Sequence, residues 1–267
     1  MENILKKIIE KKKEKILISK KNFSINSLLK NIKNINNFLD FKYKMKKRNY
    51  ERKISIIAEI KKASPSAGIL VKNFNPLNIA KLYVENGASF LSVLTEEDFF
   101  LGKNDYIKNI KNNHKIPILC KDFFIDPYQV ALAKSYGADC ILIILSAVDN
   151  MLAKDLYEAA NDLNISTLIE VHSKKEAENA LSFENSIIGI NNRNLKTLEV
   201  SLDNAVNISK ILTPHKNPLV CESGIHSTED IKFIIENTGI YNFLIGESIL
   251  TSEDIGLKLK EFIEINH

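Results

Sequence analysis

Glu59 and Lys61 lie near the end of an apolar run, in the stretch AEIKKASPSAG that begins at residue 58. Residues two apart in an extended strand point to the same side, so both charges face one way while Ala58 and Ile60 face the other. A charge that faces a protein interior needs a partner or changes its protonation state. A lysine and a glutamate placed there together can supply an acid and a base near neutral pH.

Several other apolar runs also end in side chains that can transfer protons or hold a substrate. They end in Lys121 with Asp122, in Glu170, in Asn191 with Arg193, in Glu222 with Ser223, and in Gly246 with Glu247. Any one of these side chains, taken alone, could belong to a structural ion pair. Structural pairing does not require Lys, Glu, Asn, Arg and Ser at successive strand ends, so together they indicate an active site.

The elements that must position these residues are eight short apolar runs, which alternate with helical segments from residue 54 onward. The runs are ISIIAEIK, FLSVLT, IPILCKDF, CILIIL, STLIEVH, IIGINNR, PLVCESG and NFLIGES. Runs that are apolar nearly throughout are typical of strands covered on both faces. Eight strand–helix units in succession predict a (β/α)8 TIM barrel of the α/β class. A doubly wound sheet is the alternative, but no G-x-G-x-x-G turn follows the first strand.

The Lys-rich residues 1–53 precede the first strand, and residues 54–267 form the predicted catalytic barrel domain. We expect one or two basic helices, in NILKKIIEKKKEKILI and SINSLLKNIKNINNFLDFKYKM, as an N-terminal helical extension. Nucleic-acid binding through this extension is an alternative function, but aromatic residues are not interleaved with its lysines. The net charge of +4 is mild for a chain of 267 residues.

Composition and cysteine usage bound the class of protein. The chain is 45% hydrophobic and 26% charged, as is ordinary for a globular protein. Cys120, Cys140 and Cys221 are widely spaced in apolar runs, which favours reduced thiols and a cytoplasmic location. The chain has no apolar signal sequence and no run of eighteen apolar residues, so we expect no export and no membrane span. Its five histidines lack metal-ligand spacing, so we expect no metal and no cofactor.

The segments ESGIHS and IGES place Gly and Ser directly after the last two strands. The loops after strands seven and eight are the recurrent phosphate-binding place of this fold, because backbone N–H groups are accessible there. Tight turns alone would also use these residues. Together the two segments predict a small phosphorylated substrate.

Seven motifs, in order, resemble those of indole-3-glycerol phosphate synthase over roughly residues 50–250. They are AEIKKASPSAG, SVLTEEDFFLG, ILCKDFFIDPYQV, LIEVHS, IGINNRNLKTLEVSLD, ESGI and FLIGES. The resemblance implies a lyase of tryptophan biosynthesis that closes, decarboxylates and dehydrates 1-(2-carboxyphenylamino)-1-deoxyribulose 5-phosphate. It also implies basic helices that cover the barrel mouth, and we expect a monomer.

The same resemblance implies the roles of individual residues. The catalytic residues would be Lys121, the general acid of ring closure, with Glu170, Lys61, Glu59 and Asn191. The division of dehydration among Glu59, Lys61 and Glu170 stays open. Substrate and phosphate would contact Ser64, Phe100, Phe123, Arg193, Glu222, Ser223, Gly224, Gly246, Glu247 and Ser248. At Gly246–Ser248 we expect backbone N–H groups and Ser248, not the Glu247 side chain, to hold the anion.

Two further functional hypotheses remain beside the synthase. Another phosphate-binding barrel, such as phosphoribosylanthranilate isomerase, typically uses Cys and Asp as acid and base, whereas Lys61 and Lys121 stand at the matching strand ends here. A catalytically inactive barrel kept as a scaffold is disfavoured because every expected catalytic position is filled.

Overall fold

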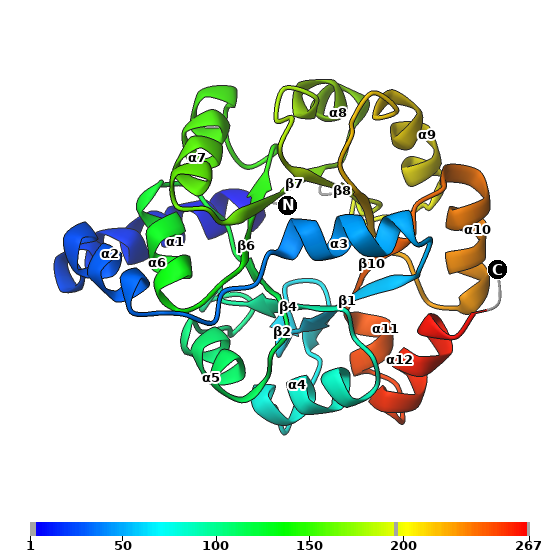
Figure 1. Ribbon diagram of the computed structural model, residues 1–267, viewed down its shortest axis with the longest axis horizontal. Helices are drawn as coiled ribbons and strands as arrows, with labels where there is room; N and C mark the ends of the chain where they lie inside the picture. The colour runs from blue at the N-terminus through cyan, green and yellow to red at the C-terminus, as the bar shows by residue number, and fades with distance from the viewer. Residues whose placement is uncertain (1–3, 195–196, 266–267) are drawn as a thin grey trace.

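The eight apolar runs form the parallel strands of a closed barrel (Figure 1). In this computed structural model, which describes residues 4–194 and 197–265, the barrel order is β1-β10-β9-β8-β7-β6-β5-β4. Pairing of β1 with β4 closes the barrel, which confirms the predicted (β/α)8 fold. The strands are β1 Ser55–Ile60, β4 Phe90–Leu94, β5 Ile118–Lys121, β6 Cys140–Ile144, β7 Ser166–Val171, β8 Ile187–Asn191, β9 Leu219–Glu222 and β10 Asn242–Ile245.

Helices follow the strands and surround the barrel (Figure 1). Polar caps start several of them: the side chains of Asp149, Ser173 and Ser227 accept hydrogen bonds from N–H groups in the first turns of α7, α8 and α10. The helices are α4 Pro76–Glu85, α5 Asp105–Asn113, α6 Tyr128–Ser135, α7 Asn150–Asp162, α8 Lys174–Ala180, α9 Asp203–Ile211, α10 Thr228–Thr238, α11 Glu247–Leu250 and α12 Ile255–Ile263.

Side chains alternate across each strand between the helix layer and the barrel interior. On β1, Ala58 and Ile60 pack in the layer between strands and helices, whereas Ile57 belongs to the interior cluster. Glu59 therefore points inward, one layer above Ile57 along the strand. The interior is apolar at the amino ends of the strands and becomes charged toward their carboxyl ends.

The N-terminal extension contains three helices, α1 Ile4–Asn22, α2 Ile25–Lys33 and α3 Phe41–Tyr50, where we expected one or two. The predicted second helix is interrupted because Asn34 ends α2 and the side chain of Asp40 caps the first turn of α3. Residues 1–3 of the extension, and Leu195 and Lys196 of the INNRNLK segment, lie outside the described residues.

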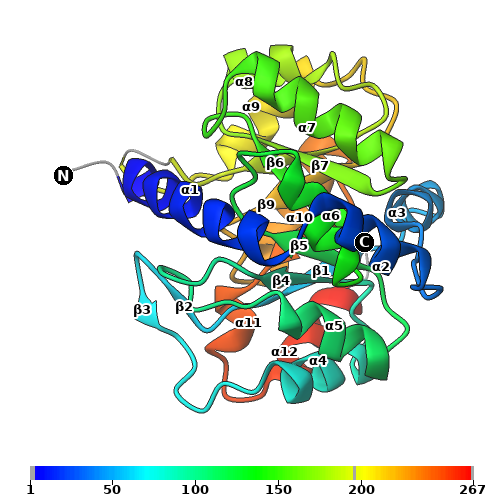
Figure 2. The ribbon, with the colours of Figure 1, turned by 90° about the vertical axis from the view of Figure 1, so that its left-hand side faces the viewer.

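The helices of the extension lie at both ends of the barrel rather than only at its mouth (Figure 2). α3 closes the amino end, where Phe41 and Met45 are fully buried and Phe41 packs on Phe90 with ring centroids 4.4 Å apart. α1 lies toward the carboxyl end, where Lys12 contacts Asp122 at 2.7 Å. α3 lies at the base of the barrel because its apolar side chains fill the open amino end.

Lysines of α1 are used in ion pairs with the barrel. Lys15 contacts Glu97 at 2.8 Å and Lys20 contacts Asp126 at 2.6 Å, beside the buried pair of Lys12. These carboxylates lie on the loops after β4 and β5, so α1 is held against two loops of the mouth. Among the helices of the described residues, none is long and apolar enough to span a membrane.

Candidate active site

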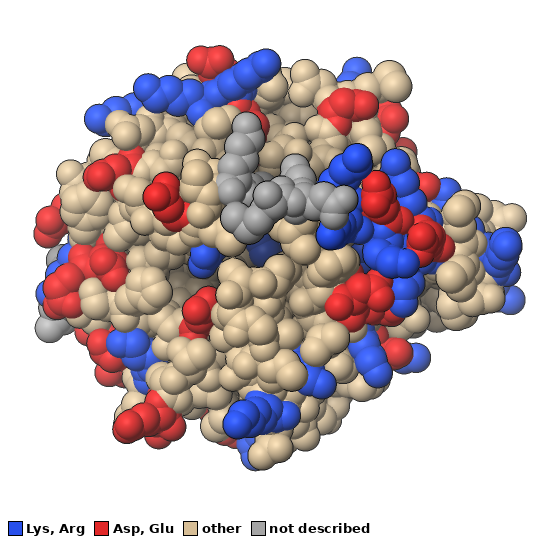
Figure 3. Space-filling model, turned by 180° about the vertical axis from the view of Figure 1, so that it is seen from behind, with Lys and Arg blue, Asp and Glu red and all other residues tan. Residues whose placement is uncertain are grey.

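The carboxyl ends of the parallel strands bring the polar residues of six strands to one face. Neighbouring strands are aligned so that Glu170 pairs in register with Gly189, and Asn191 with Glu222. Viewed from the side opposite α3, this face is hollowed near its centre, with basic and acidic side chains in the hollow (Figure 3). The strand order thus assembles residues that are far apart in the sequence, such as Glu59 and Glu222, which are 163 positions apart.

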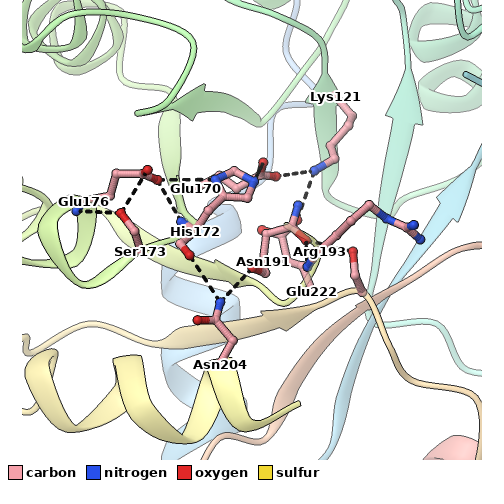
Figure 4. Close-up of polar contacts among 10 residues, drawn as sticks. Lys121, Glu170, His172, Ser173, Glu176, Asn191, Arg193, Asn204 and Glu222 are labelled. Carbon is pink, nitrogen blue, oxygen red and sulfur yellow. Dashed lines mark hydrogen bonds and ion pairs between the residues drawn. The ribbon is translucent and has the colours of Figure 1, made fainter. Parts of the chain in front are cut away.

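Lys121 is held between two carboxylates from β7 and β9 (Figure 4). Its Nζ lies 2.8 Å from Oε2 of Glu170 and 3.0 Å from Oε2 of Glu222. Burial lowers the pKa of a lysine, but the two carboxylates outweigh this effect and raise the pKa of Lys121. The ammonium is therefore charged at neutral pH and fixed toward the centre of the barrel.

The two carboxylates that share Lys121 are electrostatically different. Burial raises the pKa of both, but Lys121 and His172 together hold the pKa of Glu170 well below its usual range. Glu222 lacks the second cation and lies near the charge of Glu170, so its pKa is raised to about 8. Near neutral pH one carboxylate is ionised and its neighbour is protonated. This is the separation of an acid from a base that proton-transfer sites use.

Glu59, on β1, and Lys61, directly after it, form a second ion pair at 2.6 Å. Both side chains are largely buried, with 7% and 14% of their surface exposed. The sequence pattern suggested that Gly246 leaves room for a ligand, but a Cβ there would lie 2.6 Å from Oε1 of Glu59. Gly189 is close to Oε1 of Glu222 in the same way. These two glycines leave room for inward-pointing carboxylates on adjacent strands.

An amide network joins the ends of β8 and β9. Oδ1 of Asn191 accepts hydrogen bonds from the Ser223 hydroxyl at 2.9 Å and from the Arg193 backbone N–H at 3.0 Å. Ser223 and Gly224 both have left-handed backbone angles, φ 64° and 86°. Successive residues in such turns can point their N–H groups toward an anion. The Arg193 guanidinium donates to the carbonyl of Leu198, in the same loop between β8 and α9.

Two aromatic rings lie at the mouth, on the loops after β4 and β5. The centroids of Phe100 and Phe123 are 6.2 Å apart and their planes are tilted by 42°. The buried carboxylate of Glu96 orders the first of these loops, because it accepts backbone hydrogen bonds from Asp98, Phe99 and Phe100. The Glu96 carboxylate therefore fixes the backbone of the loop that carries Phe100.

The remaining predicted binding residues lie on the first and last loops of the barrel. Ser64 is in the two-stranded sheet formed by β2 Ala63–Ser64 and β3 Gly68–Ile69, and its Oγ accepts from the N–H of Ala67. Gly246 precedes α11, whose first two residues are Glu247 and Ser248. The Ser248 hydroxyl donates to the carbonyl of Ile225, so its hydrogen is already used. Only its backbone N–H is left as a donor.

His172 was missed by the sequence analysis, which judged histidines only by metal-ligand spacing. It follows Glu170 by two positions, the same signal that singled out Glu59 with Lys61, and its Nε2 lies 3.2 Å from Oε1 of Glu170. Among the residues that the structure describes, no cluster of three or more His, Cys, Asp or Glu side chains could hold a metal ion. The cationic partners of these carboxylates are protein side chains.

The family model for indole-3-glycerol phosphate synthase matches residues 5–262. The chain belongs to this family. An indole-3-glycerol phosphate synthase of Aliarcobacter butzleri is 42% identical over 97% of this chain and 98% of its own length. One from Polaromonas sp. is 40% identical over the full length of both chains. Enzymes of this family are carboxy-lyases of tryptophan biosynthesis.

Solved structures outside the family share only the fold. The 3-hexulose-6-phosphate synthase of Salmonella typhimurium superposes with a TM-score of 0.65 at 13% identity, covering 79% of this chain and 97% of its own. The phosphoribosylanthranilate isomerase of Thermotoga maritima gives 0.57 at 12% identity, with 79% and 97% covered. Such likeness shows a TIM barrel and says nothing about the reaction.

Proposed function

We propose that this protein converts 1-(2-carboxyphenylamino)-1-deoxyribulose 5-phosphate into indole-3-glycerol phosphate, carbon dioxide and water. The observation that carries the proposal is Lys121, held by Glu170 and Glu222 at the mouth of a barrel that belongs to the indole-3-glycerol phosphate synthase family. The reaction needs a proton donor and a base in one water-poor site, and this cluster contains both.

Ring closure is the step that we assign to Lys121. The aromatic carbon that bears the carboxylate attacks the ketone carbon of the substrate, and the ketone oxygen becomes a hydroxyl as it takes a proton. The ammonium of Lys121 points into the barrel and is supported by two carboxylates, which fits a donor for that oxygen. Once the carbonyl occupies the site, a proton lost from Nζ can be replaced through Glu222, whose pKa is raised to about 8 by burial.

Decarboxylation and dehydration follow on the same closed ring. Loss of carbon dioxide returns its bonding electron pair to the ring, and we propose that Lys61 first holds the carboxylate or the phosphate as a point charge. Dehydration needs an acid for the departing hydroxyl and a base for the ring proton. Glu59, Lys61 and Glu170 are the candidates, and Glu170 is ionised at neutral pH because Lys121 and His172 lower its pKa.

Binding of the two ends of the substrate is proposed for the surrounding loops. Phe100 and Phe123 would contact the aromatic ring, since their rings lie together at the mouth. The phosphate would lie on backbone N–H groups at Ser223–Gly224 and Gly246–Ser248, supported by the left-handed turn at the first of these pairs. We propose Ser64 as a further contact. The predicted catalytic and substrate-contacting residues also include Asn191, Arg193, Glu222 and Glu247.

We also propose a cytoplasmic monomer that needs no metal or cofactor. The cysteines Cys120, Cys140 and Cys221 are all buried free thiols, which fits a reducing compartment. Light scattering on the purified protein tests the monomer directly. Activity in the presence of EDTA tests independence of a metal.

Continuous indole fluorescence with the purified protein and the carboxyphenylamino substrate, in buffer with EDTA, tests the reaction. We expect the signal to grow with enzyme concentration. Phosphoribosylanthranilate serves as the control substrate, because its isomerase has the same fold. Turnover of phosphoribosylanthranilate, with none of the carboxyphenylamino compound by a folded sample, would overturn the proposal in favour of the isomerase.

A further inference from the structure

His172 lies between two carboxylates, one in the catalytic cluster and one outside it (Figure 4). Its Nε2 is 3.2 Å from Oε1 of Glu170, and its Nδ1 is 3.3 Å from Oε2 of Glu176. Nε2 has no hydrogen-bond partner among the described residues, so the first of these contacts acts through charge. Only 7% of the His172 side chain is exposed. The ring is thus enclosed with a negative group on each side.

Glu176 is itself held in place by the start of α8. Its Oε2 accepts the backbone N–H of His172 at 2.8 Å, and its Oε1 accepts the Ser173 hydroxyl at 3.1 Å. From α9, the Asn204 amide donates to the carbonyls of His172 and Asn191, at 3.4 and 3.1 Å. The backbone around His172 is therefore anchored by two helices outside the barrel.

Glu170 receives a different cation on each of its oxygens. Oε2 faces Lys121 at 2.8 Å, and Oε1 faces His172. We propose that His172 is a positioning residue: as an imidazolium braced by Glu176, it fixes the Glu170 carboxylate toward Lys121 and keeps it ionised during the reaction. This inference rests on the proposed function for its kinetic test. It goes beyond the family's reaction because it assigns a role to a side chain behind the reacting groups.

The charges around the pair support this role. Glu170 faces Lys121 from β5, Glu222 from β9 and His172 from just beyond the end of its own strand. His172 faces Glu170 and, from α8, Glu176. Asn204, the neighbour from α9, is uncharged. Burial lowers the pKa of His172, but the two carboxylates outweigh it and raise the pKa to about 9. A carboxylate beside each ring nitrogen favours an imidazolium at neutral pH.

The kinetic test compares the pH dependence of kcat/KM for the wild type and His172→Asn. A neutral amide cannot stabilise the ionised form of Glu170, so its pKa rises and the acidic limb of the profile moves to higher pH, by about one unit. Activity then recovers as pH increases. The substrate phosphate titrates equally in both samples, so only the difference between them is interpreted.

Two further variants separate charge from packing. Glu176→Gln keeps oxygen and nitrogen atoms for the cap of α8 but removes the charge, so the limb should move in the same direction by a smaller amount. His215→Asn is the matched control, because His215 is half-buried against the carbonyl of Ser186 at the other end of the barrel. It should leave the limb in place. A uniform loss of kcat/KM at every pH in His172→Asn would overturn the proposal and assign His172 a structural role.

Nitrogen NMR of the labelled, unliganded protein tests the charge without turnover. We expect both ring nitrogens of His172 to carry protons at pH 7.5 in the wild type, and the His172 pKa to fall in Glu176→Gln. A neutral ring at pH 7.5 would overturn the inference even if the enzyme is active. A charged ring in a protein without synthase activity would overturn the proposed function while leaving the charged bridge in place.

Discussion

Among the lysines that lie buried beside carboxylates, Lys111 at the amino end of the barrel and Lys121 at its mouth have different surroundings. Lys111 of α5, near the amino ends of the strands, contacts both oxygens of Asp139 at 2.9 and 3.1 Å. Asp139 also accepts the backbone N–H groups of Leu39 and Ile118, so it joins the N-terminal extension to the barrel. Each charge there has its complement, and the carboxylate is saturated with donors.

The cluster around Lys121 is built in the opposite way. One lysine serves two carboxylates, and Oε1 of Glu222 is buried without a hydrogen-bond partner. The unmet hydrogen-bonding capacity costs stability, which a purely structural pair avoids. Burial and an ion pair therefore do not by themselves distinguish an active site from a structural ion pair. An excess of carboxylates over cations at the strand ends does.

The largest effect should come from Lys121→Ala. We expect kcat to fall by about 10³-fold with little change in substrate binding, because the proton donor for ring closure is lost. Single-turnover indole fluorescence measures the step. Lys115→Ala, at an exposed position just before β5, is the control and should keep full activity. Near-normal turnover in Lys121→Ala would show that Lys121, like Lys111, has no role as the proton donor.

Lys111→Ala should give the complementary result. Its removal leaves Asp139 buried without its cation, so we expect the free energy of unfolding to fall by about 3–5 kcal/mol. The folded fraction should turn over normally, because Lys111 lies at the other end of the barrel. Urea unfolding measures the loss, and Lys108→Ala on the exposed face of α5 should change it little. A stable variant would mean that this pair is not the structural one.

Glu222→Gln should have a smaller, pH-dependent effect on stability. The folded pKa of Glu222 is about 8, above the 4.5 of an unperturbed glutamic acid, because burial disfavours its charge. The unfolded chain releases this proton first as pH rises, so the wild type loses stability between these two values. Gln cannot ionise and avoids that loss. We expect a Tm higher than the wild type by roughly 5 °C at pH 9 and nearly equal at pH 4.5.

Thermal melts at several pH values measure this difference. Glu236→Gln, an exposed site on α10, should show no such trend. If Glu222→Gln is less stable than the wild type at pH 9, the Glu222 carboxylate is stabilised by Lys121 as a structural partner would be. The carboxylate–lysine pairs at the mouth and at the amino end of the barrel would then both be structural.

Most of the fold could be predicted from periodicity. Each of the eight apolar runs contains one barrel strand, because strands covered on both faces have few polar residues to confuse the pattern. The extension was harder: the apolar spacing of residues 24–45 is helical on both sides of the break, and Asn34 and Asp40 act as caps only when the chain turns there. That α3 closes the base depends on how Phe41 fits the barrel interior.

The sequence by itself determined the barrel and the set of polar strand ends, since eight apolar runs alternate with helical segments. It also placed Glu59 and Lys61 on one side of the chain, because side chains two apart in a strand share a face. Only the tertiary structure decided which charges meet. Lys121 lies between Glu170 and Glu222, and His172 bridges Glu170 to Glu176, because strand order and register set distances between residues far apart in the chain. Their protonation was decided there too, because a pKa depends on burial and neighbouring charges, and both exist only after folding.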